Sequence, residues 1–184
     1  RCFQIEEALQ DLGIPVFHDD QHGTAIVLLA GLINAAKVVN KGLGDLRVVI
    51  NGAGAAGTAI AKLISGVGVE EASVDPVQDV LLCDSKGIIS RDREDLNEEK
   101  RKLLTVSNTN NVSGSLKEAL NDADVFIGVS KGNLLTAMDV SSMADNAIIF
   151  GMANPVPEIM PEEAVKGGGR GSRNETERFS KPGE

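Results

Sequence analysis

The sequence predicts an α/β protein of Rossmann type, a doubly wound parallel sheet with helices on both faces. Two observations carry this prediction. Short runs of β-branched and aliphatic residues alternate along the chain with segments of helical apolar spacing, which is typical of βαβ units. The first of these runs is followed directly by a glycine-rich turn, of the kind that joins a strand to a helix in dinucleotide-binding folds.

The composition sets the size of the domain and the partners to expect. The chain has 184 residues, which suits one domain of ordinary size, and 42% of them are hydrophobic, which is enough for a buried core. Because the sequence has no Trp and no Tyr, that core must be mainly aliphatic. A net charge of -9 disfavours nucleic acid and anionic membrane surfaces as partners.

The expected location follows from the cysteines and from targeting patterns. The two cysteines, Cys2 and Cys83, suggest reduced thiols rather than a disulfide framework. The sequence shows no signal-peptide pattern, and its longest apolar stretch, at 25–36, is too short to cross a bilayer. We therefore expect a cytoplasmic protein without membrane contact.

Each element is placed by its own pattern. Continuous aliphatic runs, typical of buried parallel strands, predict strands at 46–51, 80–84, 125–130 and 147–151. Apolar residues at helical spacing predict helices at 5–12, 25–37, from the glycine turn to about 67, and 115–121, then a helical turn at 140–143 and a helix beginning at 161–165. We expect the helix at 25–37 to be buried on most sides. The charged stretch 86–104 is expected to form surface loop and helix.

Two helix starts carry local signals. Ser115 is a suitable N-cap, and Glu118, three residues later, completes a capping box. Pro161 suits a first helical turn, where its missing N–H is not needed.

The composition changes at Gly167. From there to the end the chain contains one Phe and no Val, Ile or Leu, and it is rich in Gly, Arg and Glu. Such a segment has too little apolar surface to offset the entropy of ordering. We therefore expect a folded domain at 1–166 and a disordered tail at 167–184.

The glycine turn is the first candidate site. Gly52, Gly54 and Gly57 form GxGxxG directly after a predicted strand and at the start of a helix, which is the required context. The first glycine permits the tight turn, the second lets the backbone approach a pyrophosphate, and the third lets helix and strand pack closely. The unpaired N–H groups of the helix start then face the phosphates. A strand–helix turn without a ligand is the alternative.

Asp84 ends the next predicted strand. A carboxylate there can accept hydrogen bonds from the adenosine ribose and repel a 2′-phosphate, which favours NAD over NADP. Lys86 follows almost at once and could pair with a phosphate, so NADP stays possible. A solvated carboxylate at the strand end is the alternative.

Two adjacent carboxylates form the second candidate site. Asp19 and Asp20 are flanked by His18 and His22, and hard cations such as Mg²⁺ or Mn²⁺ prefer oxygen ligands. A solvated pair that caps the helix at Thr24 explains the composition equally well. A closed zinc site is disfavoured, because the chain has no further His and only two Cys.

Asn154 is the third candidate. It follows the last predicted strand, and ligands of open α/β sheets bind beyond the carboxyl ends of the strands. Its amide can donate to a carboxylate or carbonyl oxygen. The alternative is that Asn154 only opens a turn before Pro155.

Together these segments resemble bacterial and archaeal malic enzymes. The sequence FHDDQHGTA at 17–25 is very similar to the signature segment of that family and is far more specific than GxGxxG. The motifs GAGAAG, LLCDSKG, ADVFIGVS and MANPVPEI follow in the order that the family shows. The resemblance extends from Cys2 to about Lys166.

The resemblance implies a reaction and a set of roles. Malate and NAD(P)⁺ become pyruvate, CO₂ and NAD(P)H with a divalent metal, Mg or Mn, in a parent enzyme that is a homo-oligomer. Asp20 is then a metal ligand with Asp19 as its companion, and Asn154 contacts the substrate. The dinucleotide would be bound by Gly52, Ala53, Gly54, Ala55, Ala56, Gly57, Asp84 and Ser130.

The sequence also departs from the family pattern. The Tyr and Lys that act as general acid and base in the family, and a Glu-Asp pair of the metal site, are expected in an N-terminal region that precedes Arg1. The present chain alone is therefore expected to be inactive. Residues 173–184 can be back-translated into a DNA sequence that, read in a frame shifted by one base, encodes Arg-Ser-Asp-Phe-Pro-Asn-Gln. This segment resembles the sequence that follows the Asn-Pro segment in the family. We therefore expect that a frameshift near 167–169 produced the tail.

Two other functions compete with this one. The first is another dehydrogenase with a similar domain, such as an amino-acid dehydrogenase. The second is a nucleotide-binding module without catalysis. The cluster at 17–25 separates the first alternative from a malic enzyme, because a metal-independent dehydrogenase does not need it.

Overall fold

The computed structural model describes residues 2–67 and 75–169. Its elements follow in the order α1 (Cys2–Leu9), η1 (Gln10–Leu12), α2 (His22–Val39), η2 (Leu43–Asp45), β1 (Arg47–Asn51), α3 (Ala55–Ile64), β2 (Asp79–Asp84), β3 (Gly87–Ile88), α4 (Glu98–Leu103), α5 (Leu116–Leu120), β4 (Val125–Gly128), α6 (Ala137–Ser141), β5 (Ile148–Gly151) and α7 (Pro161–Lys166).

The sheet has five strands in the order β3-β2-β1-β4-β5. β1 pairs in parallel with β2 and with β4, and β5 is parallel to β4. The four predicted strands and their parallel arrangement are confirmed. The short strand β3 was not predicted, and it pairs antiparallel to β2 at the sheet edge. Its glycine, Gly87, has a φ of 108°, and a Cβ there would overlap the carbonyl oxygen of Gly114.

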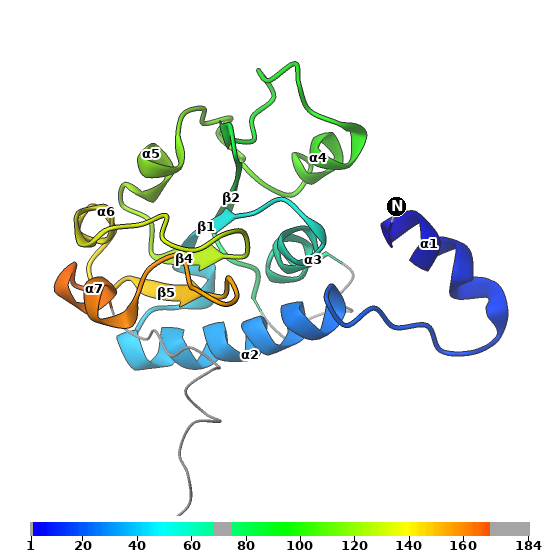
Figure 1. Cartoon of the computed structure of the whole chain (residues 1–184), viewed down its shortest axis with the longest axis horizontal. Coiled ribbons are helices and arrows are strands. Elements are labelled where there is room, and N and C mark those ends of the chain that lie inside the picture. Colours follow the sequence, from blue (N-terminus) through cyan, green and yellow to red (C-terminus); the bar gives the residue numbers. More distant parts are fainter. Residues whose placement is uncertain (1, 68–74, 170–184) are drawn as a thin grey trace, which may run out of the picture.

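Helices cover both faces of the sheet, as predicted for a doubly wound fold (Figure 1). On one face α2 and α3 pack on alternate side chains of the parallel strands, with Ile50, Leu82 and Ile127 at 1% exposure or less. On the other face α5, α6 and α7 cover the remaining side chains, with Phe126 fully buried. The strands are therefore buried on both sides, which explains why their sequences are continuous apolar runs.

The expectation for α2 was partly wrong. Its inner side chains, Leu28 and Leu32, are buried in the core, but Ile26, Val27 and Val38 are more than half exposed. With 18 residues, α2 is also longer than the apolar stretch that predicted it. It is the one helix of the described chain that is long and apolar enough to cross a membrane. A core helix meets the same criterion, so the finding does not by itself indicate a span.

The helix starts carry the predicted signals and one more. Ser115 and Glu118 form the expected capping box at α5, and Pro161 occupies the first turn of α7. Thr136 and Asp139 form a second capping box, so α6 begins before the predicted helical turn at 140–143. The stretch 86–104 is not all surface, because Ile88, Ile89 and Leu103 belong to the core.

The C-terminal part has a described and an undescribed portion. Gly169, three residues past the predicted boundary, is buried, and its N–H donates to the carbonyl oxygen of Ala164. Residues 170–184, on which the predictions of disorder and of a frameshift mainly depend, lie outside the described residues.

Candidate functional site

A cavity of about 710 Å³ lies beyond the carboxyl ends of β1, β2 and β4. This is the edge where open α/β sheets bind ligands, and the volume suits a small molecule or part of a cofactor. Four of the predicted dinucleotide-binding residues are in its wall, which is lined by Asn51, Gly52, Ala53, Asp84, Ser85, Lys86, Gly87, Ser115, Leu116, Ser130, Lys131 and Leu134. The predicted residues Gly54, Ala55, Ala56 and Gly57 continue from this wall into the start of α3.

The three glycines have the geometry that their predicted roles require. Gly52 has a φ of 126°, and a Cβ there would lie 2.7 Å from the carbonyl oxygen of Val129. A Cβ at Gly57 would overlap the carbonyl oxygen of Gly52, so only glycine lets α3 approach β1 this closely. A Cβ at Gly54 would meet nothing within 4 Å. The fold therefore does not need Gly54 for packing, whereas an approaching phosphate would need the open space beside it.

Ser130 is fixed to the end of β1. Its hydroxyl oxygen accepts a hydrogen bond of 2.8 Å from the side-chain amide of Asn51, which is 6% exposed. The backbone N–H of Val129 donates to the carbonyl oxygen of Asn51. These bonds tie the loop after β4 to the strand that carries the glycine turn.

Asp84 lies in the cavity wall, but its carboxylate already has four donors. The guanidinium of Arg93 binds both oxygens, at 2.9 and 3.0 Å, and the backbone N–H of Lys86 donates to one of them at 2.9 Å. The ammonium of Lys100 binds the other. A carboxylate accepts about four hydrogen bonds, so this one has no free position for a ribose hydroxyl unless a donor moves away. The alternative of a solvated carboxylate does not describe this arrangement, and the predicted hydrogen bonds to a ribose stay a prediction.

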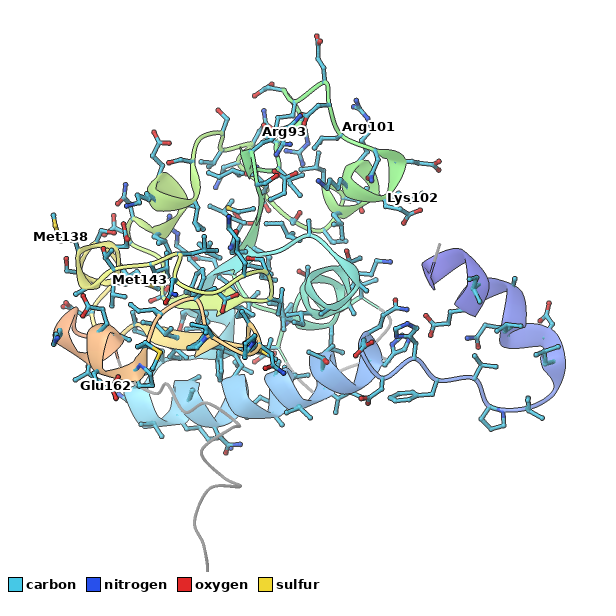
Figure 2. All side chains as sticks on the ribbon, viewed as in Figure 1. Arg93, Arg101, Lys102, Met138, Met143 and Glu162 are labelled. Carbon is cyan, nitrogen blue, oxygen red and sulfur yellow. The ribbon has the colours of Figure 1, made fainter. Side chains whose placement is uncertain are left out.

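The ion pairs dominate the titration of this group. Burial raises the pKa of Asp84, but the hydrogen bonds from Arg93, Lys100 and the Lys86 backbone outweigh it and hold the pKa at about 2. Hydrogen bonds to Asp95 and Asp84 raise the pKa of Arg93 above its ordinary value. Figure 2 shows Arg93 in the green part of the chain, near α4.

The predicted metal residues are accessible. Asp19 and Asp20 are both exposed, and neither carboxylate has a hydrogen bond or ion pair within the described residues. The predicted capping role is not seen, because the N-cap of α2 is Gln21 and no side chain caps it. Within residues 2–67 and 75–169, no group of three or more His, Cys, Asp or Glu side chains is placed to hold a metal ion.

The two histidines of this cluster have different surroundings. His22 binds the carboxylate of Glu6 in α1, and Gln21 donates to the same carboxylate at 2.8 Å. His18 has a buried Nδ1 without a hydrogen-bond partner.

Asn154 lies on the loop after β5, at the same edge of the sheet as the cavity. Its side chain is exposed and makes no hydrogen bond within the described chain. The Asn154–Pro155 peptide bond is cis. The structure therefore leaves the amide available to a ligand, although Asn154 is not in the wall of the cavity.

Residues 21–168 match the family described as malic enzyme, NAD binding domain. The chain belongs to the malic enzyme family. It is 52% identical to the bifunctional malic/malolactic enzyme of Bacillus subtilis over 91% of this chain and 39% of that protein. It is 48% identical to the probable NADP-dependent malic enzyme of Rickettsia prowazekii over 88% of this chain and 20% of that one.

Solved structures also match the chain to malic enzymes. The crystal structure of an NAD-dependent malic enzyme from Thermotoga maritima matches with a TM-score of 0.82 and 42% identity, over 91% of this chain and 43% of that chain. The chain thus spans less than half the length of these relatives. Matching dehydrogenases outside the family are below 20% identity and show the fold alone. The family match decides against the alternative of an amino-acid dehydrogenase.

Several residues of the site were not found from the sequence. Arg93 and Lys100 reach Asp84 from 9 and 16 residues away, a distance at which no short motif links them. Asn51 was assigned only as a strand end. Glu158 stands inside the segment MANPVPEI, where a carboxylate among Pro, Val and Ile is the one available signal.

The Asp84 network should make stability depend on acid pH. The pKa of Asp84 in the folded chain is about 2, below its ordinary 3.8, so its stabilisation is complete above pH 4 and is lost as the pH falls through about 2. Asp84→Asn should therefore lower the free energy of unfolding at pH 7 by about 2 kcal/mol and flatten its fall in acid. Urea denaturation between pH 7 and pH 2.5 measures both effects, with exposed Asp11→Asn as the control. Parallel pH curves for the wild type and Asp84→Asn would contradict the assignment.

Proposed function

We propose that this domain binds NAD or NADP in an enzyme that oxidises and decarboxylates malate to pyruvate and CO₂. Family membership carries the proposal, together with the position of the glycine turn, Asp84, Ser130 and Asn154 at one edge of the sheet. We further propose that the enzyme is a cytoplasmic homo-oligomer without nucleic-acid or membrane partners. This part rests on the composition and the family resemblance.

The residues of the chain have separate tasks in this reaction. The glycine turn and the first N–H groups of α3 bind the pyrophosphate, because a helix start offers unpaired donors to an anion. Ser130, which also lines the cavity, holds the dinucleotide from the loop after β4. The exposed amide of Asn154 donates to a carboxylate or carbonyl oxygen of malate and orients it. A dinucleotide held by these residues would supply the hydride acceptor for the oxidation of malate at C2.

A divalent cation, Mg²⁺ or Mn²⁺, fits the carboxylates at 19 and 20. Asp20 is assigned as the ligand and Asp19 as its companion. Both carboxylates are exposed with open lone pairs, and such cations use one or two protein carboxylates plus substrate and water oxygens. The bound cation supplies positive charge that stabilises the electron pair left when the carboxylate departs as CO₂.

The preference between NAD and NADP should be small. Asp84 favours NAD, since its charge repels a 2′-phosphate, but its carboxylate is shared with Arg93 and Lys100. An ammonium that leaves Asp84 can pair with a phosphate instead. The relatives include both NAD- and NADP-dependent enzymes.

Gly54→Ala should weaken NAD binding and lower stability by no more than about 1 kcal/mol, since Gly54 is the N-cap of α3 and alanine is a poorer N-cap than glycine. The added methyl meets no protein atom within 4 Å but occupies the space through which a pyrophosphate would approach. Calorimetric titration of the chain should show a Kd at least about tenfold higher than that of the wild type, as expected for a displaced phosphate contact. Gly44→Ala, where the methyl makes only ordinary contact, is the control. NAD binding by Gly54→Ala at wild-type affinity would place the dinucleotide elsewhere.

Lys100→Ala should shift the cofactor preference toward NAD. The substitution frees one oxygen of Asp84 for a ribose hydroxyl and removes a cation that pairs with a 2′-phosphate. The ratio of Kd values for NADP and NAD should be below about tenfold in the wild type and rise about tenfold or more in the variant. Lys37→Ala, at an exposed position of α2, should leave the ratio unchanged. A fall in the ratio of the Kd for NADP to the Kd for NAD in Lys100→Ala would contradict the roles assigned to Asp84 and Lys100.

Asp20→Asn should abolish metal-dependent malate turnover in the complete enzyme while NAD binding survives. The amide has the shape of the carboxylate but lacks the charge that binds a hard cation. Mn²⁺ titration and a coupled absorbance assay measure the two losses. Asp11→Asn, another exposed carboxylate, serves as the control. Unchanged Mn²⁺ affinity and activity would remove Asp20 from the metal site.

A further inference from the structure

Glu158 is a buried carboxylate that the proposed reaction does not use. Its exposure is 0%, and within the described chain it has no ion-pair partner. Asp139, the other buried acidic residue of the described chain, is paired with Lys117 at 3.0 Å. Burying a carboxylate costs folding free energy unless hydrogen bonds satisfy its oxygens, so the question is which donors bind Glu158.

The carboxylate joins two loops. One oxygen accepts from the backbone N–H of Ser130 at 3.0 Å, and the other accepts from the backbone N–H of Ala153 at 3.1 Å. The carbonyl oxygen of the same residue accepts from Leu134 and Leu135. Glu158 therefore connects the loop after β4 with the loop after β5.

Space for this carboxylate is made at the strand end. A Cβ at Gly128, the last residue of β4, would overlap the carboxyl carbon of Glu158. Glycine at this position leaves room for the side chain at the end of β4. Glu158 itself is not part of the cavity wall.

The bonds form one continuous chain across the site. The side chain of Asn51 donates to the Ser130 hydroxyl, the Ser130 N–H donates to Glu158, and Glu158 accepts from Ala153, which precedes Asn154. The chain of bonds begins in the dinucleotide cavity and ends beside the amide assigned to malate. A group that bridges two loops in this way transmits the ordering of one loop to the other.

We propose that Glu158 is a positioning residue that couples the dinucleotide cavity to the loop that carries Asn154. When the cofactor orders the Ser130 loop, the carboxylate orders Ala153 and with it the adjacent Asn154. This inference rests on the proposed function, since it takes the cavity for the dinucleotide site and Asn154 for the substrate contact.

Glu158→Gln tests the bridge itself. Glutamine fills the same space, but its NH₂ group must face one of the two backbone N–H donors, so one hydrogen bond is lost. Amide hydrogen exchange of the chain, followed by NMR, should become about tenfold faster or more at Ser130 or Ala153, the size expected for a bond to a charged group. Exchange at Phe126 in β4 should stay within about twofold. Glu162→Gln on α7 (Figure 2), an exposed residue, makes the same change of charge and should alter neither loop.

NAD addition tests the coupling. In the wild type NAD should slow exchange at Ser130 and Ala153 together, whereas in Glu158→Gln it should slow Ser130 and leave Ala153 unchanged. If NAD slows exchange of the wild type at the glycine turn and Ser130 but not at Ala153, the coupling is overturned. This measurement uses the wild type alone and does not depend on whether a variant folds. Unchanged exchange at both loops in folded Glu158→Gln overturns the bridge. If NAD protects no amide, the dinucleotide assignment fails separately, and with it the coupling.

Discussion

The register of the parallel strands is the constraint on which the site depends. Asn51 is level with Cys83 on one side and with Gly128 on the other, and Gly128 is level with Gly151. Four strands therefore end in one row, and the chain leaves each of them toward the same edge. Gly52, Asp84, Ser130 and Asn154 each follow within three positions of this row, so that segments about a hundred residues apart in the sequence meet there. A one-residue slip of a strand would turn its side chains to the opposite face of the sheet and displace the loop that follows it.

Glycines and buried polar groups allow the segments at this edge of the sheet to pack closely together. A side chain at Gly57 would keep α3 away from β1, and one at Gly128 would occupy the place of the Glu158 carboxylate. The backbone N–H groups of Ser130 and Ala153 donate to the Glu158 carboxylate rather than to a neighbouring strand, and the Asn51 amide donates to the Ser130 hydroxyl. The loops after β4 and β5 are thus joined to each other by a buried side chain that accepts from their backbone, and not by sheet pairing.

Much of the fold was predictable because local patterns and tertiary structure agree. Strands buried on both faces leave continuous apolar runs, and the capping box at Ser115 is a local signal that needs no partner from elsewhere. The features that the sequence did not predict depend on distant contacts. β3 has only two residues, too few to show the apolar run or alternation that predicts a strand. The exposure of Ile26 depends on which parts of the chain pack on α2, and this cannot be read from the helix sequence alone. The donors around Asp84 and the bridge made by Glu158 depend on side chains that only the folded chain brings together.

The cation cluster at Asp84 explains how an acidic chain binds a cofactor that is itself an anion. Lys86, Arg93 and Lys100 face the carboxylates of Asp84 and Asp95, and these three cations and two anions leave one positive charge at the cavity edge. The net charge of -9 is spread over the whole chain, and at physiological salt charges more than about 8–10 Å away are largely screened. A phosphate at the cavity edge therefore responds mainly to the nearby cations and the donors of α3. Asp84 binds two of these cations, Arg93 and Lys100. The carboxylate that repels a 2′-phosphate therefore also keeps beside it two cations that attract a phosphate. These two effects oppose each other, so the preference between NAD and NADP should be small.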